Sequence, residues 1–104
     1  MSGYILTPVA QEDLVDIRDH YLDESGYRIA RQMLVEFVEA FRFLALTPGA
    51  GHRREDLAEG RRILFWPMRD YLILYKPDTS PLQIITIARG SQDLAKLIGR
   101  RTLR

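Results

Sequence analysis

The stretch that decides the fold is residues 27–46, YRIARQMLVEFVEAFRFLAL. Its apolar side chains recur at steps of three and four residues, which aligns them along one side of an α-helix. They are Ala30, Met33, Leu34, Phe37, Val38, Phe41, Leu44 and Ala45. Burying each large one contributes roughly 1.5–3 kcal/mol before the entropy lost on ordering is subtracted. We therefore predict one long amphipathic helix that packs on another layer of structure.

Another helix is expected before this one. Thr7-Pro8 has the form of an N-cap residue followed by proline at the first helical position. Apolar residues then recur at helical spacing from Val9 to Tyr21, and Ser25-Gly26 breaks the pattern. Because so short a break joins the two helices, we expect an antiparallel helical hairpin.

Four stretches have the composition of β-strands, with turn residues at 67–70 and 77–81. They are residues 4–7, 62–66, 71–76 and 82–88. The third should be central because both of its faces are apolar, with Tyr71, Ile73 and Tyr75 on one face and Leu72 and Leu74 on the other. In the fourth, alternation places Leu82 and Ile84 on one face and Ile85, Ile87 and Arg89 on the other.

The expected fold is α+β. Gly90-Ser91 has the form of a stop and an N-cap, and Leu94, Leu97 and Ile98 indicate a short last helix. The order is then strand, helix, helix, strand, strand, strand, short helix. A helical hairpin over one face of a mostly antiparallel four-stranded sheet would bury both apolar stripes. With 104 residues and no repeat or linker, residues 1–104 are expected to form a single domain.

The composition excludes several classes of site. There is no cysteine, so disulfides and thiolate metal sites are excluded and a reducing cytoplasm is the natural location. No apolar run approaches the roughly 20 residues of a membrane-spanning helix, and the N-terminus lacks the pattern of a signal peptide. Metal-ligand spacings, phosphate-binding glycine loops and nucleophile–base patterns are also missing. We expect no cofactor, no metal and no membrane partner.

Charge is distributed unevenly along the chain. Residues 1–50 carry four Arg and eight Asp or Glu, a balance of −4, and residues 51–104 carry eleven Lys or Arg and six Asp or Glu, a balance of +5. This asymmetry favours an acidic face and a basic face, the latter suited to nucleic acid or an acidic protein segment. The alternative is a solvated surface with scattered charges.

The chain resembles the ParE/RelE superfamily of toxins, closer to the ParE branch, over nearly its whole length. In the expected first strand and helix, the resemblance is carried by Tyr4-Ile5-Leu6-Thr7, Ala10, Asp13-Leu14, Ile17 and Tyr21. In the second helix and the loop after it, it is carried by Phe41-Arg42-Phe43-Leu44-Ala45-Leu46-Thr47-Pro48, Gly51, Arg53 and Asp56-Leu57. In the last strands and the closing segment, it is carried by Tyr71-Leu72-Ile73-Leu74-Tyr75, Pro81-Leu82, Ile84, Ile87 and Asp93-Leu94. It implies the toxin of a type II toxin–antitoxin system, held in a hetero-oligomer with a cognate ParD-like antitoxin. In this family a flexible antitoxin segment folds onto the helices and sheet of the toxin, combining helix-in-groove contact with strand addition.

The superfamily has two main toxic activities. ParE-like members poison DNA gyrase and need no catalytic site of their own, whereas RelE-like members cleave messenger RNA on the ribosome. RNA cleavage needs a base for the 2′-OH, cations for the phosphate and an acid for the leaving oxygen. RelE-like nucleases commonly place His or Tyr after the last strand, but residues 88–92 here, ARGSQ, offer neither. We therefore expect a gyrase inhibitor, with the ribosome-dependent endonuclease and an antitoxin-binding module of weak or lost toxicity as alternatives.

Other acid or base candidates are weaker. His20 lies in the acidic first helix, where a surface role is expected, and His52 lies in a loop beside Arg53. Glu55 and Glu59 stand in a polar loop, where such side chains are usually solvated. No residue is assigned a catalytic role.

Seven residues are candidates for contact with the target or the antitoxin. They are Arg53, Arg61, Arg62, Trp66, Arg69, Tyr71 and Arg89. Guanidinium groups bind phosphates and carboxylates bidentately, and aromatic residues often anchor interfaces. The alternative is that the arginines are surface residues paired with nearby acids and that Trp66 closes the end of the core.

Overall fold

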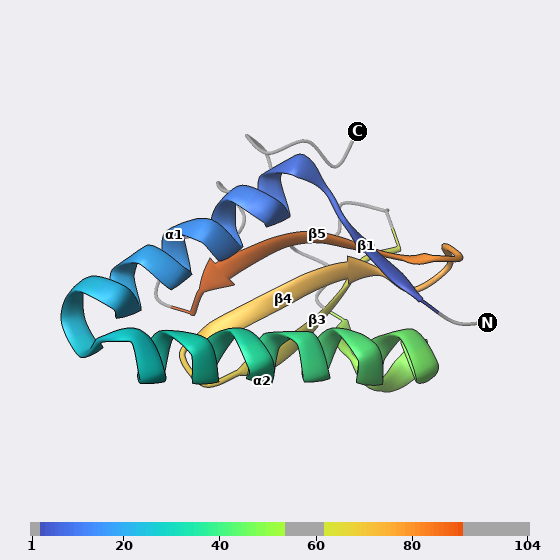
Figure 1. Cartoon of the computed structure of the whole chain (residues 1–104). Coiled ribbons are helices and arrows are strands. Elements are labelled where there is room, and N and C mark those ends of the chain that lie inside the picture. The colour runs from blue at the N-terminus through green and yellow to red at the C-terminus, as the bar shows by residue number, and fades with distance from the viewer. Residues whose placement is uncertain (1–2, 54–61, 91–104) are drawn as a thin grey trace.

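The computed structural model describes residues 3–53 and 62–90 (Figure 1). The predicted last helix and Arg61 therefore lie outside the described residues. The elements, in order, are β1 (Tyr4–Leu6), α1 (Pro8–Ser25), α2 (Tyr27–Leu46), the short 3-10 helix η1 (Pro48–Ala50), β2 (His52–Arg53), β3 (Leu64–Met68), β4 (Tyr71–Lys76) and β5 (Leu82–Arg89).

Both helices begin and end where the sequence predicts. Thr7 caps α1, because its Oγ1 accepts a hydrogen bond from the backbone N–H of Ala10 at 3.1 Å. The same hydroxyl donates to the carbonyl of Ile85 at 2.6 Å, which ties the start of α1 to β5. Gly26 separates α1 from α2 with φ of 86°, a conformation that glycine adopts without a steric penalty.

The two helices lie side by side on one face of the sheet (Figure 1). Their apolar stripes and the facing strand residues form one core cluster. Its buried members are Ala10 and Ile17 of α1, Met33, Phe37, Phe41, Leu44 and Ala45 of α2, and Leu64, Tyr71, Ile73, Tyr75, Leu82, Ile84 and Ile87 of the sheet. The predicted α+β arrangement is confirmed.

The sheet has five strands in the order β1-β5-β4-β3-β2, rather than the four expected. The additional strand is β2, which pairs antiparallel with β3 through His52 opposite Phe65 and Arg53 opposite Leu64. Two residues are too few to show an alternating pattern, so the sequence gives no sign of this strand. β4 is central, as predicted, and β1 pairs parallel with β5 while the other pairs are antiparallel.

The β3–β4 hairpin is tighter than expected. β3 runs from Leu64 to Met68 instead of 62–66, and Met68 pairs directly with Tyr71, leaving Arg69 and Asp70 as a two-residue turn. In such a hairpin the next pair, Pro67 with Leu72, is of the non-hydrogen-bonded kind. The missing N–H of proline therefore removes no bond to β4, which explains how Pro67 fits inside a strand.

A bulge in β5 overturns one prediction about its faces. Leu74 pairs with Thr86 and Tyr75 pairs with Ile84, so Ile85 is an extra residue in β5. Ile85 packs in a second cluster with Ile63, Leu74 and Ala88, whereas Ile87 belongs to the core under the helices. The prediction that Ile85 and Ile87 share a face is therefore wrong, and Arg89 lies on the side of Ile87.

Within the described residues, no helix is both long and apolar enough to span a membrane.

Candidate functional site

The candidate contact residues fall into two groups at opposite ends of the central strand. Arg53 lies opposite Leu64, which pairs with Tyr75, whereas Arg89 pairs with Tyr71 at the other end of β4. Four residues along a strand span about 13 Å. Arg53 and Arg89 therefore lie well apart on the sheet. Arg62 pairs with Asp78 at 3.5 Å.

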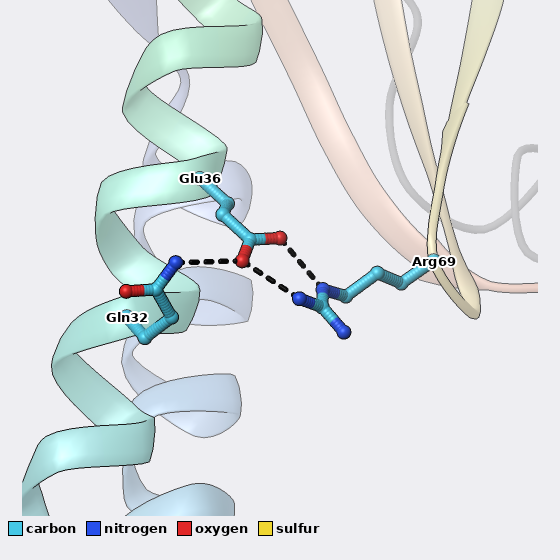
Figure 2. A network of polar contacts seen from close by, with 3 residues as sticks. All are labelled: Gln32, Glu36 and Arg69. Carbon is cyan, nitrogen blue, oxygen red and sulfur yellow. Dashed lines mark hydrogen bonds and ion pairs between the residues drawn. The ribbon is translucent and has the colours of Figure 1, made fainter.

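Arg69 is held by an internal acid (Figure 2). Its Nε and Nη2 donate to the two carboxylate oxygens of Glu36 on α2 at 2.6 and 2.7 Å, and Gln32 Nε2 donates to the same carboxylate at 3.0 Å. These hydrogen bonds lower the pKa of Glu36 to about 2, and the carboxylate raises the pKa of Arg69. Arg69 adopts φ of 54° in its turn, so the ion pair fixes a residue in an uncommon conformation.

Tyr71 is buried between the sheet and the helices. Its ring meets Phe37 edge-on at 5.6 Å between centroids. Burial, with a hydrogen bond to Tyr21, raises the pKa of Tyr71 to about 12, although Arg89 beside it acts in the opposite direction. A hydroxyl with that pKa is poorly suited to proton transfer near neutral pH. Tyr71, a contact candidate from the sequence, is therefore a buried member of the core.

Two adjoining cavities of about 580 and 180 Å³ surround this tyrosine. His20, Tyr71 and Arg89 line both of them. The smaller cavity also has Asp13 and Asp16 in its wall, so Arg89 shares it with two carboxylates. The charges in this part of the molecule largely balance one another. No cluster of His, Cys, Asp or Glu among the described residues has the geometry of a metal site.

Asp13, whose carboxylate is buried, was not among the predicted contact residues. It accepts hydrogen bonds from Thr86 Oγ1 at 2.6 Å and from the backbone N–H of Ile87 at 2.9 Å. Both donors follow the bulged residue Ile85 in β5. Asp13 thereby fixes the register of the strand segment that leads to Arg89.

Trp66 is part of a row of rings, named here the aromatic edge, formed by Phe43 of α2, His52 of β2 and Phe65 and Trp66 of β3. The centroid distances are 5.2 Å for Phe43–Trp66, 6.2 Å for His52–Trp66 and 5.4 Å for His52–Phe65. Trp66 is half-buried and also packs on the core, so it closes the core and takes part in a surface at once. Sequence reasoning missed Phe43 as a surface residue, although its place outside the apolar stripe of α2 is a usable signal.

A second surface, named here the β1 groove surface, runs along the outer edge of β1. One apolar groove, between the helices, is lined by Leu6, Leu14, Val15 and Leu34 with Arg18. Another, beside β1, is lined by Gly3, Tyr4, Ala45 and Leu46 with Arg42. Val15 is 43% exposed and Leu46 is 73% exposed. These apolar side chains come from three different elements and meet at one edge of the sheet.

The backbone of β1 is bonded on one side only among the described residues. Leu82 N donates to the carbonyl of Gly3 at 2.9 Å and Thr7 N donates to the carbonyl of Ile84 at 3.1 Å. Because bonding groups alternate along a strand in a parallel pair, the N–H and C=O groups of Tyr4 and Leu6 point to the outer edge. The carbonyl of Leu6 accepts from Gln11 Nε2 at 3.1 Å. As far as the described residues show, the remaining groups of this edge could pair with an added strand.

Comparison with known proteins agrees with this architecture. Residues 4–94 match the model of the family described as "ParE toxin of type II toxin-antitoxin system, parDE". A solved structure described as "Chromosomal ParDE TA system from P. aeruginosa" superposes with a TM-score of 0.70 at 23% sequence identity, covering 86% of this chain and 96% of that one. No curated protein matches the chain. Since the family model spans most of the sequence, the chain belongs to the ParE toxin family of type II toxin–antitoxin systems.

Proposed function

We propose that this toxin is neutralised by a ParD-like antitoxin that covers the β1 groove surface, and that the released toxin inhibits DNA gyrase in the cytoplasm. The observation that carries the first half is the outer edge of β1, with one apolar groove at Tyr4 and another at Leu6. An extended segment can pair with such an edge while its side chains enter the flanking grooves.

The chemistry of the partner follows from the lining of the grooves. Arg42 lies in the wall of one groove and Arg18 in the wall of the other, where Arg18 also contacts Asp19 at 3.0 Å. A partner segment with alternating apolar residues and a few carboxylates complements this surface in shape and in charge. Exposed Val15 and Leu46 would then be removed from water in the complex.

The test of antitoxin binding uses a ParD-like antitoxin, sought as the product of a short reading frame beside this gene. Val15→Glu and Leu46→Glu place a charge in each groove, and we expect each to weaken binding about tenfold or more, as at hot-spot positions. Tyr27→Glu is the matched control, because Tyr27 is 74% exposed at the opposite end of α2 from Leu46. Calorimetric titration would overturn the proposal if the neighbouring product does not bind or if all three variants bind alike.

Gyrase is proposed as the target on the strength of family membership, together with the lack of a nuclease constellation among the described residues. The candidate arginines near the sheet lie in two separate groups, and the hydroxyl of Tyr71 is buried with a pKa of about 12. The purified toxin should inhibit supercoiling by gyrase and accumulate cleaved DNA. Intact gyrase activity, with transcripts cut on the ribosome instead, would replace this proposal by the messenger RNA endonuclease.

A further inference from the structure

The aromatic edge has an unusual composition for the rim of a sheet. Phe43 is 43% exposed and His52 is exposed, while Trp66 and Phe65 are half-buried. His52 and Trp66 lie nearly parallel, with 8° between their ring planes. The rings come from α2, β2 and β3, so the fold gathers them at one place from distant parts of the sequence. Sheet rims more often carry charged side chains or proline, which discourage association.

Two arginines lie near the aromatic edge. Arg53 follows His52 on β2 and lies opposite Leu64, on the face of the sheet that Trp66 also occupies two residues farther along β3. Arg62 precedes the same strand, next to its partner Asp78. A phosphate group beside the rings would have the Arg53 guanidinium as a bidentate donor nearby, whereas Arg62 is paired with Asp78.

Most of the acidic residues in the described part of the chain lie on α1. Helix α1 carries six Asp or Glu and one Arg, and it packs on β5 and β1, which form the opposite side of the sheet order from β2. A polyanion is therefore repelled by the α1 side of the sheet.

We propose that the aromatic edge binds single-stranded DNA, with bases stacked on the exposed faces of Phe43 and His52 and the backbone phosphates contacted by Arg53. Stacking on exposed rings beside cationic side chains is how proteins bind single strands without reading sequence. The choice of DNA over RNA rests on the proposed gyrase function, because a gyrase poison acts where DNA strands are opened.

Trp66 is the only tryptophan of the chain, so its fluorescence reports on this surface alone. The full-length protein is titrated with an oligothymidylate of about 12 nucleotides, within the usual site size of such proteins. We expect quenching of Trp66 fluorescence, and a dissociation constant that rises with salt concentration. Duplex DNA and oligouridylate of equal length, and polyglutamate as an acidic polypeptide, serve as comparison ligands.

Substitutions then test the individual contacts. Phe43→Ala should weaken binding about 5- to 150-fold, the range found when a stacking ring is removed. Phe43→Leu keeps apolar bulk against Trp66 and should lose affinity to a similar extent with the fold unchanged. Arg53→Gln should reduce the slope of log K against log salt by about 0.7. Tyr27→Ala and Arg28→Gln, exposed positions at the other end of α2, are controls expected to change nothing.

Several results would overturn the inference. The first is that oligothymidylate does not quench Trp66 fluorescence. The second is that Phe43→Ala and Tyr27→Ala lose affinity for oligothymidylate equally. The third is that duplex DNA, oligouridylate or polyglutamate binds as tightly as oligothymidylate or more tightly. Gyrase assays on the same variants keep the two proposals apart. Gyrase inhibition without any affinity for single strands would remove only this inference, whereas single-strand binding without gyrase inhibition would remove only the proposed function.

Discussion

Asp13 on α1 and Thr86 on β5 are joined by a hydrogen bond of 2.6 Å between buried side chains that lie 73 residues apart in the sequence. The same carboxylate also accepts from the N–H of Ile87, so one acid secures a strand immediately after its bulge. A buried acceptor of this kind links the helical layer to the sheet at the position where the strand register changes.

Replacing Asp13 with Ala should destabilise the protein by about 1–3 kcal/mol, because the Thr86 hydroxyl and the Ile87 N–H lose this acceptor inside the core. Urea denaturation measures the loss. Asp16→Ala, which removes an exposed acid from the same helix, should stay within about 0.5 kcal/mol of the parent. Equal effects of the two substitutions would show that the buried bonds contribute little.

Replacing Gly51 with Ala should also destabilise the protein. An added Cβ would collide with the hydroxyl of Tyr75 and lie 3.0 Å from the carbonyl oxygen of Phe65. That hydroxyl accepts from Gly51 N at 2.9 Å and donates to the carbonyl of Pro48 at 2.6 Å, so it cannot move without breaking both bonds. We expect a loss of about 1–3 kcal/mol in thermal unfolding, as for an overpacked core.

Gly49→Ala provides the comparison for that experiment, because nothing lies within 4 Å of the Cβ it would introduce. Its unfolding temperature should be unchanged or slightly higher. A Gly51→Ala protein as stable as Gly49→Ala would contradict the close packing around Tyr75.

The ion pair of Glu36 and Arg69 should make stability depend on acid pH. The pKa of Glu36 falls from 4.5 to about 2 in the folded state, so its contribution is present above pH 4.5 and is lost as the pH falls toward 2. Glu36→Gln should therefore be less stable than the parent at pH 7, and the difference should shrink in acid. Parallel denaturation curves of Glu39→Gln, which removes an exposed acid from the same helix, provide the comparison.

Tyr71 should lose its proton only at high pH, and its neighbours Tyr21 and Arg89 should shift its pKa in opposite directions. Its pKa of about 12 is raised by burial and by Tyr21 and lowered by Arg89. Tyr21→Phe should lower the pKa of Tyr71, and Arg89→Gln should raise it, as followed by ultraviolet titration. Because the folded pKa exceeds the usual 10.0, the linked stability is present below pH 10 and is lost between pH 10 and 12. Shifts in the reverse directions would refute this arrangement.

The sequence predicts the elements that depend on local hydrophobic periodicity and on residues that cap or end helices. The range of α2, the break at Gly26 and the cap at Thr7 are confirmed because each depends on a few neighbouring residues. The central position of β4 is confirmed because apolar residues on both faces can be satisfied only inside a sheet.

Features that depend on an extra residue or a distant partner could not be predicted in this way. The bulge at Ile85 could not be predicted, because assigning strand faces by strict alternation assumes that the strand contains no extra residue. The pairing of Arg69 with Glu36 joins residues 33 positions apart, and Phe43 meets Trp66 only after α2 has packed beside β3. Arg69 and Trp66 were candidates from the sequence, but their partners Glu36 and Phe43 were not.

The parallel pairing of β1 with β5 has a consequence for how the molecule is made. Tyr4 is in register with Leu82, so the first strand finds its neighbour only after almost the whole polypeptide has been synthesised. Contacts of such long sequence separation form slowly, and a nascent chain emerges from the ribosome N-terminus first. A truncated translation product that stops before β5 lacks the strand on which β1 is built, and therefore cannot display the completed rim that an inhibitor would recognise.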